Sequence, residues 1–295
     1  MDTQTKVGRL DAPVDGGVRL LHPLCLQEGP TGEGSGRGPY IGVAVDCETT
    51  GLDWSTGRII ELALRRVRYD RDGTITDIDR AYEWREDPGE PLTEEVSRLT
   101  GLTDQDLAGE EIDTDAAVRL LTSASFVVAH NSAFDRRWIE ARLPNAAGLR
   151  WCCSMAQVDW RGRGFDGKAL GYLLVQNGFY FCGHRAANDV DAMIEMLRHR
   201  DGADRTALAE MIENGSKPSW IVRARGAHFD LKEKLRVRGY RWDAADGRKV
   251  WWREVADDQL VPEQLWLANN VYSAEARAQQ ICPEIVRVTP RTRFL

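Results

Sequence analysis

The sequence of 295 residues has no hydrophobic run long enough to cross a membrane, and its first 26 residues lack the charged-then-apolar layout of a signal peptide. Cysteine is scarce and shows no paired metal-ligand spacing; its six positions are 25, 47, 152, 153, 182 and 282. These absences argue against a membrane-spanning protein and against a disulfide scaffold. We expect a cytoplasmic protein with reduced thiols.

Positive charge is also in short supply, because 39 Lys and Arg stand against 46 Asp and Glu, for a net charge of −7. The deficit is uneven. Residues 219–295 hold 14 basic and 10 acidic residues, or +4, which leaves −11 for the rest of the chain. Bound metal ions would offset part of that acidity, so the net charge does not exclude a polyanionic partner.

Four parts can be distinguished along the chain. Residues 1–38 end in a glycine-rich tract and are expected to be flexible, and residues 201–218 have the glycine and proline content of a linker. Between them, residues 39–200 alternate apolar strands with helical patterns. This pattern predicts an α/β domain, a mixed sheet flanked by helices, followed by a small α+β domain over 219–295.

The most informative motif comes at the end of the apolar run 41–45, where Asp46 and Glu48 flank Cys47. Alternate side chains of a strand point to one face, so both carboxylates project together while Cys47 turns back into the protein. Two adjacent carboxylates repel each other unless protons or a cation supply positive charge. Oxygen-only ligands suit hard cations such as Mg²⁺ or Mn²⁺.

Two further clusters follow in order. A second apolar strand over 125–130 leads into His130, Asn131 and Asp135 at the expected opening of a helix. The third cluster places His184 five residues before Asp189, at the start of another helical pattern. A lone Asp at either position would be read as a helix cap, but the combination of four acids and a histidine points to a site.

Taken together, Asp46, Glu48, Asp135, His184 and Asp189 resemble the DEDDh 3′–5′ exonuclease superfamily, the DnaQ-like proteins that include the proofreading subunit of the bacterial replicative polymerase. The resemblance covers residues 40–200 and assigns 39–200 to an exonuclease domain with a ribonuclease H-like fold. One departure is the segment 151–155, Trp-Cys-Cys-Ser-Met, where many relatives carry Asp-Thr. We therefore do not expect the substrate preference of this protein to follow that of those relatives in every respect.

The resemblance also implies roles for the residues. Asp46, Glu48, Asp135 and Asp189 would hold two Mg²⁺ or Mn²⁺ ions, with Asp135 acting mainly through water. His184 would be the general base that accepts a proton from the attacking water. His130 is interpreted as structural, and Asp191, which breaks the family spacing, as solvated.

The implied substrate is nucleic acid with a free 3′ end, single-stranded or frayed, from which nucleoside 5′-monophosphates are released. DNA is favoured over RNA, although trimming of RNA remains the alternative. A second alternative is an accessory or proofreading-type subunit that docks a polymerase or another machine. The expected substrate-contacting residues are Thr49, Thr50, Gly51, Leu52, Asn131 and Phe134.

The C-terminal part predicts a strand over 220–225, a basic helix over 229–238 and a hairpin that joins 240–242 to 249–253. Five of the ten tryptophans lie within 219–295, interleaved with basic residues. Such interleaving suits base stacking and phosphate contact. The alternative is a small core in which the tryptophans are buried, and the sequence alone does not choose between them.

Overall fold

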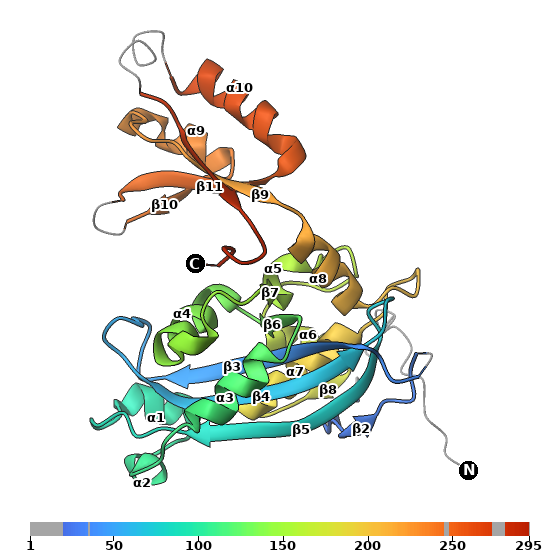
Figure 1. The fold of residues 1–295 in the computed structure, drawn as a ribbon. Helices are drawn as coiled ribbons and strands as arrows, with labels where there is room; N and C mark the ends of the chain where they lie inside the picture. The colour runs from blue at the N-terminus through green and yellow to red at the C-terminus, as the bar shows by residue number, and fades with distance from the viewer. Residues whose placement is uncertain (1–19, 35, 245–247, 273–280, 295) are drawn as a thin grey trace. The chain divides into compact units, whose positions relative to one another are not determined.

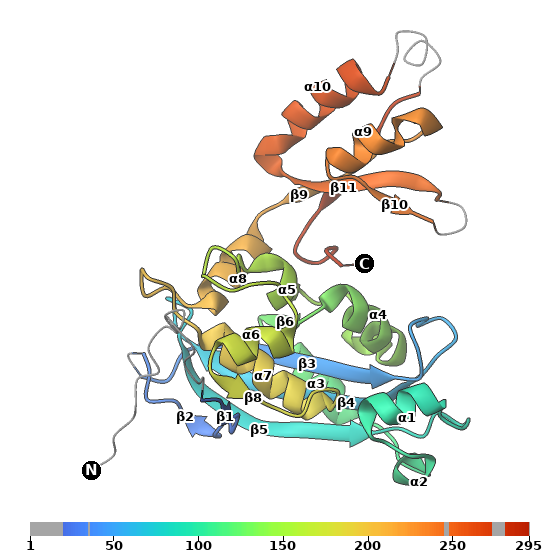
Figure 2. The same ribbon diagram turned by 180° about the vertical axis from the view of Figure 1, so that it is seen from behind.

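A computed structural model describes residues 20–34, 36–244, 248–272 and 281–294. The chain separates into two units (Figures 1 and 2). Unit 1 comprises residues 1–215 with 294–295, and unit 2 comprises residues 216–293.

Unit 1 is built on a six-stranded mixed sheet in the order β2-β5-β4-β3-β6-β7. Its strands are Gly29–Pro30 (β2), Tyr40–Thr49 (β3), Ile59–Tyr69 (β4), Ile75–Arg85 (β5), Phe126–Ala129 (β6) and Trp151–Cys153 (β7). The central strand β3 runs antiparallel to β4 and parallel to β6. Hydrogen bonding on both edges fixes the backbone of β3, which carries the first acidic motif.

Helices cover both faces of this sheet, which explains why β3 and β4 are apolar on both sides. The helices of unit 1 are Glu94–Thr100 (α1), Asp104–Leu107 (α2), Thr114–Thr122 (α3), Ser132–Arg142 (α4), Ser154–Gln157 (α5), Leu170–Gln176 (α6), Ala186–Arg198 (α7) and Ala207–Ser216 (α8). Core residues of one face pack with α3 and α4, and those of the other face pack with α6, α7 and α8. The α/β mixed sheet predicted from the sequence is confirmed.

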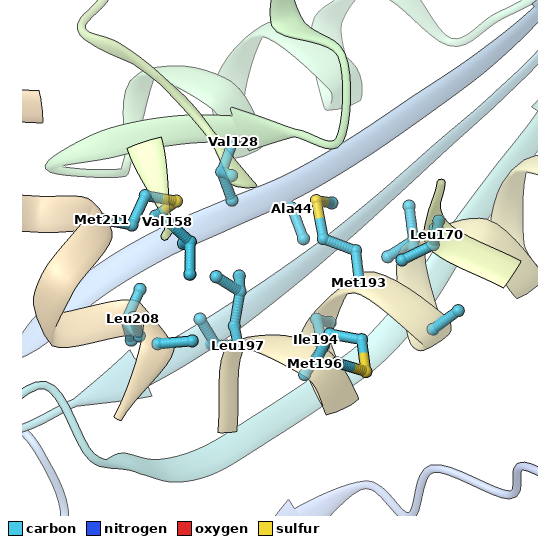
Figure 3. Close-up of a cluster of buried hydrophobic side chains, with 14 of the residues drawn as sticks. Ala44, Val128, Val158, Leu170, Met193, Ile194, Met196, Leu197, Leu208 and Met211 are labelled. Atoms are coloured by element: carbon cyan, nitrogen blue, oxygen red, sulfur yellow. The ribbon is translucent and has the colours of Figure 1, made fainter. Parts of the chain in front are cut away.

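The core between the sheet and α7 is drawn in Figure 3. Met193 and Leu197 of α7 lie against Ala44 of β3, and Leu208 and Met211 of α8 complete the same cluster. All five side chains are fully buried. Burying one aliphatic side chain of this size stabilises a fold by about 1.5–3 kcal/mol, so α7 is held firmly on the sheet.

Residues 201–216 do not form the linker predicted over 201–218. Most of this segment is helix α8, which packs on the turn between β4 and β5. Thr206 Oγ1 donates to the carbonyl of Gly73 at 2.7 Å, and a Cβ on Gly73 would lie 2.7 Å from Ala209. The prediction of a linker relied on the glycine and proline content of this segment. It gave too little weight to the helical spacing of the apolar residues 207, 208 and 211, which are buried in α8.

The sequence also predicts a flexible tract over 1–38, but the described part of this segment forms two short paired strands. His22–Pro23 (β1) pairs in parallel with Phe179–Tyr180 (β8), and β2 pairs with β5. Leu24 and Leu26 pack against the core of unit 1. Residues 1–19 and 35 lie outside the described residues, so the prediction is not tested there.

Unit 2 contains a four-stranded antiparallel sheet in the order β10-β11-β9-β12, with helices that share one core with it. Its strands are Ser219–Arg223 (β9), Arg241–Asp243 (β10), Val250–Ala256 (β11) and Glu284–Val288 (β12), and its α-helices are Lys232–Val237 (α9) and Leu260–Asn270 (α10). The predicted small α+β domain and its hairpin are confirmed. Among the described residues, no helix is both long and apolar enough to span a bilayer.

Candidate active site

Strand β3 presents Asp46 and Glu48 on one face near its C-terminal end. Their neighbours Val45 and Cys47 are buried in the core of the opposite face, with α3 and α4. The two carboxylates therefore lie on the side that α7 covers, as the strand alternation predicts.

Asp189 comes from the first turn of α7 and completes a three-carboxylate group. One oxygen from each of Asp46, Glu48 and Asp189 lies within 4.8 Å of the others. The residues are 143 positions apart in sequence at their widest, so the group exists only because α7 packs across β3. Half-burial of all three side chains leaves the group open to solvent on one side.

The electrostatics of this group favour a bound cation. Burial, followed by repulsion from neighbouring carboxylates, raises the pKa of Asp46 well above its usual range. The same two causes raise the pKa of Glu48 to about 7, and burial raises the pKa of Asp189 to about 6. Carboxylates that resist ionisation and offer only oxygen donors fit a hard divalent cation, which would supply the missing positive charge.

Asp135, the fourth predicted acid, lies outside this three-carboxylate group. It sits in the first turn of α4, on the other side of β3, and is 3% exposed. Its Oδ1 accepts hydrogen bonds from the backbone N–H of Cys47 at 3.3 Å and from Cys47 Sγ at 3.5 Å. Burial raises the pKa of Asp135 to about 7. Through Cys47 it touches the strand segment between the two acids of β3.

His184 lies in the bend that precedes α7 and is exposed. Its backbone φ is +62°, in the left-handed region that non-glycine residues rarely adopt. His184 lowers the pKa of Asp189, against the larger effect of burial, so the imidazole and the carboxylate interact. The predicted base therefore lies near Asp189, one residue before the N-cap of α7.

Two residues that the sequence analysis missed lie beside the group. Glu61 of β4 stands directly opposite Glu48 in the sheet register and is 0% exposed. It accepts hydrogen bonds from Arg185 Nη2 at 2.9 Å and Nε at 3.1 Å, and its hydrogen bond raises the pKa of that guanidinium. The signal was present in the sequence, since Glu61 interrupts the apolar run Ile-Ile-Glu-Leu-Ala-Leu.

The predicted substrate-contacting turn follows β3 at once. Thr50 donates its backbone N–H to Arg58 at 2.9 Å, and Thr49 Oγ1 donates to the carbonyl of Gly51 at 2.7 Å, so the turn is well defined. Leu52 is 89% exposed at its tip. This aliphatic side chain projects into solvent four residues after Glu48 and is available to a ligand.

Of the other predicted contacts, Asn131 is the exposed N-cap of α4, while Phe134 is half-buried against Trp138 with ring centroids 5.8 Å apart. His130 has both ring nitrogens engaged, with Ser154 Oγ at 2.8 Å and the carbonyl of Lys168 at 2.7 Å, which agrees with a structural role.

Asp191 is not the solvated acid that the sequence suggested. Its carboxylate forms an ion pair with Arg65 of β4 at 2.5 Å, and that arginine is 5% exposed. The pair ties α7 to the sheet.

Comparison with known proteins shows the family to which residues 43–197 belong. Residues 43–197 match the RNase_T family model, described as an exonuclease, and this match spans just over half of the chain. All four predicted acids and His184 fall within it. The family recognised from the motifs is confirmed at this level.

Curated relatives include a DNA polymerase III subunit and DNA polymerases III of PolC type. The subunit epsilon of Treponema pallidum is 29% identical over 165 residues, which are 52% of this chain and 73% of that protein. The PolC-type DNA polymerase III of Staphylococcus haemolyticus is 34% identical over 208 residues, which are 64% of this chain and 14% of that protein. That of Halalkalibacterium halodurans is 41% identical over 95 residues, 32% of this chain and 6% of that protein. The chain thus spans only a small part of these PolC-type relatives.

Among solved structures, the fold resembles E. coli Exonuclease I in complex with a dA16 oligonucleotide. The TM-score is 0.50 at 15% identity, covering 82% of this chain and 70% of that one. At this identity the likeness concerns the fold alone, and it supports the ribonuclease H-like arrangement.

Proposed function

The chain belongs to the RNase_T exonuclease family of enzymes, and from this we propose that it is a metal-dependent 3′–5′ exonuclease that releases nucleoside 5′-monophosphates. The observation that carries the proposal is the convergence of Asp46, Glu48 and Asp189, whose oxygens lie within 4.8 Å of one another. The relatives named as a DNA polymerase III of PolC type and as a DNA polymerase III subunit epsilon support DNA as the substrate. RNA is the alternative that the experiment below separates.

Two Mg²⁺ or Mn²⁺ ions, when bound, would activate the attacking water and stabilise charge on the phosphate and on the leaving 3′ oxygen. Asp46, Glu48 and Asp189 would hold the ions directly. Asp135 would contribute through water, and its hydrogen bonds to Cys47 support the strand between the other acids.

His184 would accept the proton of the attacking water at a ring nitrogen. The residue is exposed, adjoins Asp189 and lies on the edge of the carboxylate group, so it can reach a water on the substrate side. The exposed Leu52 and the turn 49–51 would contact the terminal nucleotide, with Asn131 and Phe134 on the neighbouring helix start. A closed pocket for one chain end would restrict cleavage to free 3′ termini.

Unit 2 would also bind the nucleic acid. It would do so through the face of its sheet on which α9 and α10 do not pack. Trp220, Trp251 and Trp266 are partly buried and pack against the core of unit 2, which favours a structural role for these three of the five tryptophans. Trp252 points the other way by strand alternation, and its partners in the register are Arg223 and Arg241. An aromatic ring between two arginines suits stacking on a base beside phosphates.

The proposal is tested on 3′-labelled single strands of DNA and RNA with Mg²⁺ or Mn²⁺, comparing wild type with Asp46→Asn. We expect stepwise digestion by the wild type, faster on DNA, and almost none by the variant, because Asn removes a charged ligand while keeping its shape. Full activity in excess chelator, or in Asp46→Asn, would contradict the mechanism.

An accessory role in a polymerase assembly is the second candidate, since the relatives carry that name. It predicts weak activity of the isolated chain and stimulation by a replicative polymerase preparation. The expected cytoplasmic location stays a prediction.

A further inference from the structure

We propose that Glu61 and Arg185 form a positioning pair that holds His184 beside the three carboxylates. This inference rests on the role proposed for His184. Neither residue is required to touch the substrate; the pair acts by fixing the backbone from which the base projects.

Glu61 makes an unusually complete set of contacts for a buried side chain. Its Oε1 accepts from Arg185 Nη2 and Nε, and its Oε2 accepts from the backbone N–H of Ala186 at 2.8 Å. Arg85 adds a longer contact at 3.7 Å. With donors on both oxygens, Glu61 is committed to the start of α7 rather than to a metal ion. Consistent with this, it is not a member of the three-carboxylate group.

These contacts replace the cap that α7 lacks. Arg185 is the N-cap residue and makes no side-chain cap hydrogen bond of its own. Glu61 instead reaches across from β4 to the first free N–H of the helix, and a carboxylate at this position is favoured by the helix dipole. Asp189 Oδ2 accepts the N–H of Arg185 at 3.3 Å from within the helix. The start of α7 is therefore fixed by one acid from the sheet and one from its own first turn.

Loss of the Glu61–Arg185 contacts should affect His184 most. It precedes Arg185 directly and holds a left-handed φ of +62°, a conformation that surrounding contacts must maintain. The body of α7 has other attachments: Val190 and Met193 are buried in the core, and Asp191 pairs with Arg65. Breaking the Glu61–Arg185 pair should thus release His184 while leaving the helix in place.

The test compares Glu61→Gln and Arg185→Lys with Asp191→Asn, which breaks the other ion pair between β4 and α7. A displacement of about 1 Å in a catalytic group can cost about 100-fold in rate. We expect kcat to fall roughly 10- to 100-fold in Glu61→Gln with KM within about twofold, and roughly tenfold in Arg185→Lys, which keeps the charge but not the two-nitrogen contact. Asp191→Asn should lower the Tm and keep kcat.

If Glu61→Gln does not fold, Arg185→Lys carries the comparison, because its side chain is 34% exposed and tolerates exchange. Wild-type kcat in the folded variants would overturn the pair while leaving the proposed function intact. Inactivity of the wild type on every labelled strand would overturn both.

A double-variant experiment shows whether the pair acts through His184. In the His184→Ala background, adding Glu61→Gln should cause no further loss of kcat, since the base it positions is already gone. A second loss as large as that in the wild-type background would place the effect elsewhere in the site and overturn the inference. Mn²⁺ affinity measured by calorimetry should stay within about threefold in Glu61→Gln; loss of binding would likewise overturn it.

Discussion

Neutralising Glu48 should stabilise the metal-free protein at alkaline pH while abolishing its activity. Burial and neighbouring acids raise the pKa of Glu48 from 4.5 to about 7. Between these values the folded state binds more protons than the unfolded state, so stability falls as the pH rises through this window. The cost is fully present above about pH 7 and absent below about pH 4.5. Glu48→Gln removes it, because glutamine never ionises.

The size of the effect follows from the shift. About 2.5 pKa units at 1.36 kcal/mol each correspond to about 3 kcal/mol. The carboxylate is only half-buried and solvent screens part of this cost, so we expect a gain of about 1–2 kcal/mol at pH 8. For a domain of this size that raises the Tm by roughly 5 °C.

The assay is calorimetric melting of the full chain in chelator at pH 4 and pH 8, following the transition that Mg²⁺ shifts in the wild type. Asp72→Asn is the matched control, since Asp72 is exposed on the turn at the opposite end of β4. The variant should melt higher than wild type at pH 8 and close to it at pH 4, and Mg²⁺ should raise its Tm less. A lower Tm for Glu48→Gln at pH 8 would refute the electrostatic reasoning.

Three further outcomes are expected. His184→Ala should lower kcat by roughly 10² to 10⁴ while Mn²⁺ binding survives, which calorimetry and rate measurements on labelled DNA check together; an unchanged rate would reject His184 as the base. A circular single strand should resist digestion under conditions that degrade its linear form, and gel analysis showing internal cuts would contradict the 3′-end specificity. Trp252→Ala should raise KM more than the exposed control Phe229→Ala does and leave the salt dependence of DNA affinity unchanged, because tryptophan contributes base stacking and not phosphate contact; equal KM values for the two variants would reject Trp252 as a stacking residue.

The sequence predicts those parts of the site that depend only on interactions between residues close together in the chain. Strand alternation places Asp46 and Glu48 on one face whatever the rest of the chain does, and the spacing of His184 and Asp189 is set by one bend and one helical turn. The hairpin of unit 2 follows from two short aromatic strands and the polar turn between them. In each case the determining interactions lie within a few residues.

The tertiary structure decided what depends on contacts between distant segments. The sequence shows Glu61 as an acid in an apolar strand, but its partners Arg185 and Ala186 are more than 120 residues away and meet it only across the packed sheet. The sequence predicts a solvated Asp191, but in the structure Asp191 forms an ion pair with Arg65. Likewise, whether 207–216 is a linker or a helix depended on a surface to bury it. The sequence by itself determined which groups could act; packing determined their partners, because a charge or an apolar face is stabilised only by what the fold brings to it.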